Sequence, residues 1–168
     1  MILQKLQDAL NDQINKEMYS EYYYLSMASY FNSIGLNGFE NFFLVQVEEE
    51  RFHSMKMYNF LTEKGGRVIL KTINEPETEF KSALDVFKLA FEHEKFVSKC
   101  INELMDIAIE LKDHSAKSFL NWFVDEQVEE EATMDSFLNK LRLINGDGMG
   151  LLMLDKELSE RTFTPPAK

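Results

Sequence analysis

The sequence predicts an all-α protein, a four-helix bundle with a long crossover between its second and third helices and a short fifth helix at the C-terminal end. Prolines and glycines are few, 3 and 7 among 168 residues, and they fall between long stretches. This distribution favours long helices over a turn-rich β-sandwich. Within the long stretches, apolar residues recur in alternating steps of four and three, a period of 3.5 that is typical of the interior-facing seam of a left-handed bundle.

Breaks in the pattern set the limits of each predicted helix. The breaks lie at Gly35 and Gly38, Gly65-Gly66, Asn74-Glu75-Pro76, Asp113 and Asn145-Gly146-Asp147-Gly148. They predict helices at residues 4–34, 39–64, 82–112 and 115–144, with a short helix at 149–160. We therefore expect one domain over residues 1–162, followed by a loose tail over residues 163–168.

The connection between the second and third predicted helices is long. It extends from Arg67 to Lys81 and contains β-branched residues and Pro76. A tight hairpin forces neighbouring helices to run antiparallel, whereas a link of this length can cross the whole bundle. We expect the second and third helices to run parallel.

Composition and charge exclude several classes of partner. With 18 Lys and Arg against 29 Asp and Glu, the net charge is −11, which repels nucleic acids and anionic membranes and favours cations. The single cysteine, Cys100, excludes an internal disulfide framework. Residues 1–5 lack a signal-peptide pattern and no apolar run is long enough to span a membrane, so we expect a cytoplasmic protein.

Each of the four seams carries a carboxylate near its middle. These residues are Glu17, Glu50, Glu94 and Glu130. A helix of about 30 residues is roughly 45 Å long, so a four-helix bundle places its mid-helix residues in one layer. A slip of the seam assignment by one residue would instead expose these acids, but the slip would have to occur in all four helices.

Four ionised carboxylates in an apolar core lose their hydration and repel one another. The seams offer no Lys or Arg at that level, only His53 and Gln127. The counter-charge is therefore expected from outside, and two divalent metal ions would balance four carboxylates. Glu50 and His53, spaced i, i+3, face one point, and mixed carboxylate and imidazole ligands suit iron or manganese better than magnesium or calcium.

Short segments along nearly the whole chain carry a family resemblance. They are Leu10-Asn11-Asp12-Gln13, Tyr19-Ser20, Val47-Glu48-Glu49-Glu50-Arg51-Phe52-His53, Glu92-His93-Glu94-Lys95, Glu126-Gln127-Val128-Glu129-Glu130-Glu131 and Leu154-Asp155-Lys156-Glu157-Leu158. In combination they resemble the bacterial non-haem ferritins. The resemblance implies a ferritin-like bundle that oxidises Fe²⁺ with dioxygen and stores a ferric oxyhydroxide mineral inside a shell of 24 subunits, with the fifth helix at the four-fold axes.

The resemblance also implies roles for individual residues. Glu17, Glu50 and His53 would hold one iron of a ferroxidase centre, with Glu50 as the bridge, and Glu94 and Glu130 would hold the second, with Gln127 beside it. Tyr24 matches a tyrosine near the centre in this family, although a core tyrosine bonded to a carboxylate fits equally well. A third iron site would use Glu49, Glu126 and Glu129 and share Glu130, and a solvated acidic face is the alternative for those three.

At some positions this sequence differs from related families of di-iron helical bundles, and these differences bear on the expected metal centre and on haem. The fourth helix carries Gln127-x-x-Glu130 in place of a second Glu-x-x-His, which leaves one imidazole and an asymmetric centre. Arg51 stands where bacterioferritins have the methionine that binds haem, so we expect no haem. His93 and His114 are interpreted as surface or capping residues.

Two other functions remain open from the sequence. One is an oxidoreductase of related fold that retains its two metal ions, and the other is a helical bundle that binds partners without metal. The chain lacks the Cys pairs of rubrerythrins and a second imidazole, which disfavours the first. A buried layer of four unbalanced acids disfavours the second.

Overall fold

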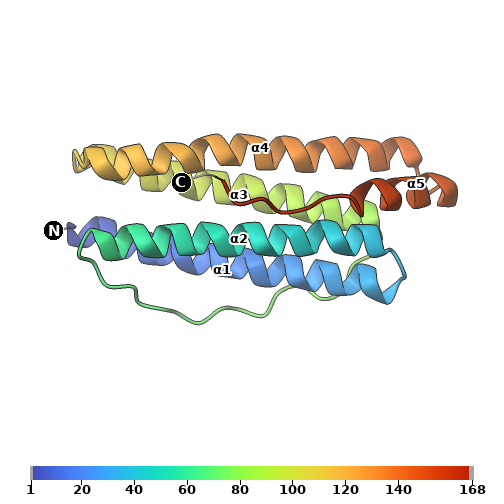
Figure 1. The fold of residues 1–168 in the computed structure, drawn as a ribbon, viewed down its shortest axis with the longest axis horizontal. Helices are drawn as coiled ribbons and strands as arrows, with labels where there is room; N and C mark the ends of the chain where they lie inside the picture. The colour runs from blue at the N-terminus through green and yellow to red at the C-terminus, as the bar shows by residue number, and fades with distance from the viewer. Residues whose placement is uncertain (1, 167–168) are drawn as a thin grey trace.

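The computed structural model describes residues 2–166, so residue 1 of the predicted domain and residues 167–168 of the predicted tail lie outside the described residues. The described chain forms five helices and contains no strand. The helices are α1 (Gln4–Ser33), α2 (Asn37–Glu63), α3 (Ala83–Glu110), α4 (His114–Ile144) and α5 (Gly148–Leu158). The predicted fold class is confirmed (Figure 1), and each predicted helix end lies within two residues of the observed one.

The helix ends have local causes in the sequence. α1 stops where Gly35 adopts a left-handed conformation, with φ of +76°, and the Leu36 N–H then donates to the Phe31 carbonyl at 3.0 Å. Three helix starts carry side-chain caps that accept a hydrogen bond from the first turn, namely Ser82, Asp113 and Asp147. The predicted breaks at Gly35, Asp113 and Asp147 therefore coincide with residues that end or cap helices, whereas the break at Asn74-Glu75-Pro76 lies inside the crossover.

The start of α2 is capped from a distant part of the chain. No local side chain caps this helix, but Oδ1 of Asp155 on α5 accepts hydrogen bonds from the Gly38 and Phe39 N–H groups at 2.8 and 3.0 Å. Gly38 allows this approach, since a Cβ there would lie 1.6 Å from the Asp155 carbonyl oxygen. The docking of α5 and the start of α2 therefore depend on each other.

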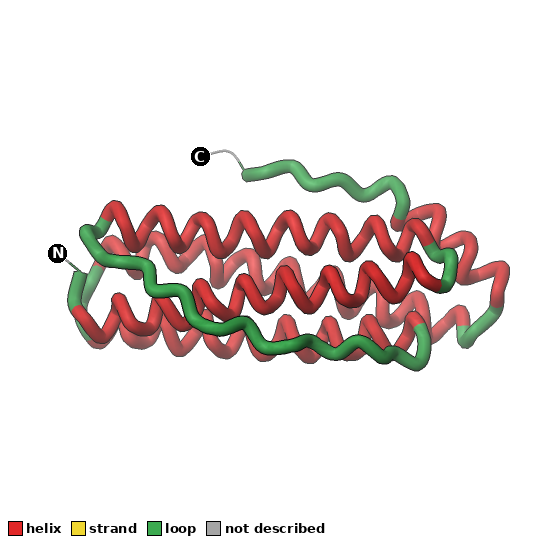
Figure 2. The backbone as a smooth tube through the Cα atoms, turned by 90° about the horizontal axis from the view of Figure 1, so that it is seen from below, coloured by secondary structure: helices red, strands yellow, loops and turns green. Residues whose placement is uncertain are grey.

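The crossover between α2 and α3 runs lengthwise over the α1 and α2 hairpin, so α2 and α3 run parallel as predicted (Figures 1 and 2). Side chains of α1 hold it in place. Asn11 accepts a hydrogen bond from the Ile69 N–H at 2.7 Å and donates to the Arg67 carbonyl at 3.1 Å. Ser26 donates to the Glu77 carbonyl at 2.7 Å. Backbone groups of the crossover, which forms no strand, therefore make hydrogen bonds with side chains of α1.

Two apolar cores fill the bundle, one toward each end. The core near α5 is rich in buried phenylalanine, including Phe31, Phe39, Phe43 and Phe87, whereas the opposite core is mainly aliphatic. Between the two cores lies a layer of buried polar side chains. None of the helices within residues 2–166 combines the length and low charge needed to cross a membrane.

Residues 163–166 of the predicted C-terminal tail form no helix, and all of them except Phe163 are exposed. After α5 the chain turns back and runs along the bundle in an extended form (Figures 1 and 2). Asn41 on α2 donates hydrogen bonds to the Leu158 and Arg161 carbonyls at 3.0 and 2.9 Å. The ring of Phe163 lies 6.1 Å from the ring of Phe52. The tail packs on α2 because this helix presents an amide and an aromatic ring toward it.

Candidate metal centre

Four glutamates from four helices lie in the polar layer. Their exposed fractions are 1% for Glu17, 1% for Glu50, 0% for Glu94 and 5% for Glu130. The alternative of a slipped seam is therefore excluded, since all four side chains point into the bundle. The 3.5-residue period places them at one level because it repeats in all four helices.

The tightest group of potential ligands joins α1 and α2. Nδ1 of His53 lies 3.5 Å from Oε2 of Glu50 and 3.8 Å from Oε2 of Glu17. Ligands about 2.1 Å from one metal ion stand about 3 to 4 Å apart, so these three atoms have the spacing of a shared ion. Both carboxylate oxygens are buried and lack a hydrogen-bond partner. A cation would satisfy them.

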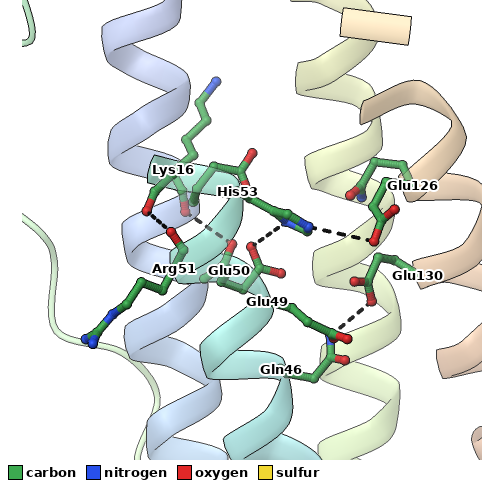
Figure 3. Close-up of polar contacts among 12 residues, drawn as sticks. Lys16, Gln46, Glu49, Glu50, Arg51, His53, Glu126 and Glu130 are labelled. Carbon is green, nitrogen blue, oxygen red and sulfur yellow. Dashed lines mark hydrogen bonds and ion pairs between the residues drawn. The ribbon is translucent and has the colours of Figure 1, made fainter. Parts of the chain in front are cut away.

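The second ring nitrogen of His53 faces α4. Nε2 lies 3.8 Å from Oε1 of Glu126, and His53, Glu126 and Glu130 form a second group of converging ligand atoms. Figure 3 shows the imidazole extending from α2 toward Glu126, with Glu50 on its other side. His53 thus links the two groups, and each of its nitrogens can serve one ion at most.

The carboxylate of Glu94 is held by two neighbours. Its Oε1 accepts a hydrogen bond from the Tyr24 hydroxyl, and its Oε2 accepts one from the Gln127 side-chain amide at 3.1 Å. Gln127 also lies 3.3 Å from the Ser98 hydroxyl. Tyr24 and Gln127, both predicted near the centre, therefore touch it through Glu94.

Two further glutamines support the glutamates. Gln13 donates to Oε1 of Glu17 at 2.7 Å, and Gln46 donates to Oε2 of Glu130 at 3.0 Å. Both side chains are buried, and neither of them was assigned a role from the sequence. The sequence feature that could have indicated them is a polar residue one helical turn from a mid-helix glutamate. This spacing allows a contact along the same helix, as for Gln13, or to a neighbouring helix, as for Gln46.

Burial and mutual repulsion raise the pKa of three of the glutamates. Burial, together with the charge of Glu130, raises the pKa of Glu94 to about 8. Burial and the charge of Glu49 raise the pKa of Glu130 to about 7. Burial also holds the pKa of Glu50 well above its usual range, although His53 opposes it. The metal-free layer therefore retains protons near neutral pH, which a metal ion would displace.

His53 and Glu17 form the charged part of the layer. Burial disfavours the imidazolium ion, but the carboxylates of Glu126, Glu17 and Glu50 outweigh it and hold the pKa of His53 well above its usual range. Burial likewise opposes ionisation of Glu17, but hydrogen bonding and the charge of His53 lower its pKa. Without metal, the protonated imidazole is the only positive charge among these buried side chains.

The residues predicted for a third site do not all converge. Glu126 lies with His53 and Glu130, as described above. Glu129 is exposed, and within residues 2–166 neither it nor Glu49 belongs to a converging ligand group. Instead, Oε2 of Glu49 lies 2.8 Å from Nη2 of Arg161 in the C-terminal tail.

The interpretation of His93 as a surface or capping residue is wrong. Its ring is partly buried between α1 and α3, with Nε2 2.7 Å from the Ser20 hydroxyl and the Tyr23 ring centroid 5.3 Å away. Burial lowers the pKa of His93 to about 4, so the ring is neutral near pH 7. His114 is the exposed first residue of α4, as expected.

A four-helix bundle with a long crossover and a buried layer of glutamate and histidine side chains defines the ferritin-like class of helical bundles. The chain belongs to the ferritin family: the family described as "Ferritin-like domain" matches residues 7–144. The fold and the position of the polar layer agree with this assignment.

Curated relatives and solved structures support the same family. The chain is 40% identical to a bacterial non-heme ferritin of Staphylococcus aureus (strain MRSA252), over 97% of this chain and 98% of the relative. It is 41% identical to that of Staphylococcus haemolyticus, with the same coverage. An open-pore ferritin from the hyperthermophilic archaeon Archaeoglobus fulgidus superimposes with a TM-score of 0.96 and 52% identity, over 96% of this chain and 100% of that chain.

Proposed function

We propose that this chain is an iron-storage protein with ferroxidase activity, which oxidises Fe²⁺ with dioxygen at the buried layer and deposits ferric oxyhydroxide mineral inside a shell of subunits. Family membership supports this function. Iron is the substrate here, and dioxygen accepts the electrons that two Fe²⁺ ions release. The protein contributes geometry and charge neutralisation, while the iron carries the redox chemistry.

One observation carries the proposal. Oε2 of Glu17 and Oε2 of Glu50 are buried, have no hydrogen-bond partner and lie within 3.8 Å of Nδ1 of His53. A buried carboxylate oxygen without a partner is costly, so its retention in a core calls for a cation. Three ligand atoms of two chemical types at this spacing suit Fe²⁺.

We assign the iron positions as follows. Glu17, Glu50 and His53 bind the first Fe²⁺, Glu50 bridges, and Glu94 and Glu130 bind the second beside Gln127. The hydrogen bonds from Tyr24 and Gln127 orient Glu94 for this role. A third position would use Glu126, Glu130 and Glu49, with Glu129 at its exposed edge.

We further propose assembly into a shell of 24 copies, with α5 at the four-fold axes. The archaeal structural relative is described as an open-pore ferritin, which supports a shell with openings. A net charge of −11 on each chain would attract cations to such openings. The cytoplasm is the proposed location, because the free, buried Cys100 is compatible with a reducing compartment.

The decisive experiment is aerobic loading with excess Fe²⁺, followed by gel filtration and measurement of iron per chain in the protein peak. We expect far more iron than the centre itself can bind, in a peak of shell size. A Glu50→Ala variant should lose most of the fast loading, and Glu48→Ala, an exposed neighbour on the same helix, should load normally.

Other outcomes would contradict the proposal in distinct ways. About two irons per chain in a small oligomer would indicate a di-iron catalyst that retains its metal. No retained iron, with the same thermal stability for wild type and Glu50→Ala in the presence and absence of Fe²⁺, would indicate a bundle without a metal layer.

A further inference from the structure

The segment after α5, residues 159–166, forms the C-terminal tail and places the positive charge of Arg161 beside the acidic layer. Nη2 of Arg161 lies 2.8 Å from Oε2 of Glu49, and the two side chains are only 24% and 19% exposed. The guanidinium carbon lies 4.3 Å from the centroid of the Phe42 ring, and Nη1 lies 3.4 Å from the Phe42 carbonyl oxygen. Asn41 binds the Arg161 carbonyl at 2.9 Å. Arg161 is thus anchored through its side chain and its backbone.

Glu49 stands next to the second ligand group. Its charge raises the pKa of Glu130, and the charge of Glu126 in turn raises that of Glu49, whose pKa is raised first of all by burial. Glu49 lies one helical turn before His53 on α2, and Nε2 of His53 lies 3.8 Å from Oε1 of Glu126, so Glu49 shares the face of α2 that is turned toward Glu126. A metal ion at Glu126 and Glu130 would have to compete for the Glu49 carboxylate with the guanidinium group of Arg161, which already pairs with Oε2.

We propose that Arg161 determines how many metal ions this chain binds, by pairing with Glu49 and withholding it from a third ion at Glu126 and Glu130. The inference rests on the proposed function, since it concerns metal binding at the edge of the same layer. Arg161 is a specificity-determining residue that acts through Glu49 and contacts no metal itself. The expected ligand is a divalent cation that prefers oxygen donors.

The physical basis is competition between two cations for one carboxylate. A third ion must separate Glu49 from the guanidinium group, and it also meets the charge of Arg161 at short range. Linkage requires the converse effect, so that an ion bound with Glu49 weakens the anchoring of the tail. The Phe42 ring and the Asn41 amide hold Arg161 in position. Arg161 therefore stays available to compete with a metal ion for Glu49.

Calorimetric titration of the metal-free protein with Co²⁺, which dioxygen does not oxidise under these conditions, tests the proposal. We expect two strong sites and a weak third site in the wild type. Arg161→Gln should strengthen the third site by about tenfold, and the double variant Arg161→Gln with Glu49→Gln should lose that gain. Arg142→Gln, which removes an equal charge from an exposed position on α4, is the matched control.

A second measurement follows the tail itself. Hydrogen exchange of residues 159–166 should become faster when Co²⁺ fills the third site of the wild type, and it should not respond to Co²⁺ in Glu49→Gln. Arg161→Lys keeps the charge but loses the planar contact with Phe42, so its third-site affinity should fall between those of the wild type and Arg161→Gln. Because Arg161→Lys keeps the positive charge in the tail, it also controls for a folding defect.

The outcomes separate this inference from the proposed function. If the wild type binds no Co²⁺ at the two strong sites, the proposed function fails. If those two sites bind normally while the third-site affinity is the same in the wild type, Arg161→Gln and Arg142→Gln, the role of Arg161 is overturned. An equal gain in Arg142→Gln would attribute the effect to net charge and would also overturn it.

Discussion

The hydroxyl group of Tyr24 donates a hydrogen bond to Oε1 of Glu94, a residue 70 positions further along the chain. Because Gln127 occupies Oε2 of the same carboxylate, Glu94 is fully bonded without metal, whereas Glu17 and Glu50 each keep a free oxygen. The two halves of the layer thus differ in their readiness to bind an ion. An ion on the side of His53 has only protons to displace, whereas an ion on the side of Glu94 must also replace a hydrogen-bond partner from the protein.

Tyr24→Phe should therefore affect the second ion more than the first. The variant loses a buried hydrogen bond to a carboxylate, which costs about 1 to 2 kcal/mol of stability, and the pKa of Glu94 should rise further. We expect slower iron oxidation at a nearly normal affinity for the first ion. Stopped-flow absorbance after mixing with Fe²⁺ and oxygen measures the rate, and metal titration measures the affinity.

Tyr22→Phe is the matched control for this prediction, since Tyr22 is 49% exposed on the same helix. It should oxidise iron and unfold as the wild type does. Equal rates for Tyr24→Phe and the wild type would mean that the hydroxyl only fills the core.

Glu17→Ala and His53→Ala should each slow the fast absorbance rise on mixing with Fe²⁺ and oxygen by at least about tenfold, because each removes a ligand of the first ion. Glu48→Ala, exposed on α2, should leave the rise unchanged. Unaltered kinetics in both ligand variants would place the chemistry outside this layer.

The metal-free protein should lose stability as the pH rises through the neutral range. Glu94 has a folded-state pKa of about 8 against 4.5 for the free side chain, so between these values the folded state holds a proton that the unfolded chain has released. The free energy of unfolding then falls with pH, by about 1 kcal/mol per unit for one such group. The raised pKa of His53 likewise makes the free energy of unfolding fall as the pH rises. The lowered pKa of Glu17 changes this free energy only at lower pH.

Thermal unfolding of the chelator-treated protein at fixed concentration, between about pH 5 and pH 8, checks this slope. Glu94→Gln should flatten it, since an amide does not titrate, while Glu92→Gln, exposed one half-turn away, should not. A stability that rises over this interval would show that the layer is already ionised.

The contact between α5 and the start of α2 gives a structural prediction. Asp155→Ala removes the acceptor for the Gly38 and Phe39 N–H groups and should cost about 1 to 2 kcal/mol. Gly38→Ala should be worse, because its Cβ would overlap the Asp155 carbonyl. Thermal unfolding and gel filtration measure both effects, with the exposed Asp106→Ala as the control. A Gly38→Ala protein that melts like the wild type would contradict the docking of α5.

Much of the fold was predictable because its causes are local. The left-handed turn at Gly35 and the caps at Ser82, Asp113 and Asp147 act within a few residues, so the helix limits can be predicted from the printed sequence. The layer of four glutamates was predictable for a related reason. The regular apolar period shows which residues face the interior, and their mid-helix positions show that they lie at the same height in the bundle.

The sequence by itself thus determined the helices, the parallel crossover and the identity of the buried acids. Only the tertiary structure decided which partners those acids have. Tyr24 meets Glu94, Arg161 meets Glu49 and Asp155 caps α2, and His93 is buried against Ser20. These contacts join residues 70 or more positions apart, so they depend on how the helices pack and on the path of the tail, which no local periodicity encodes.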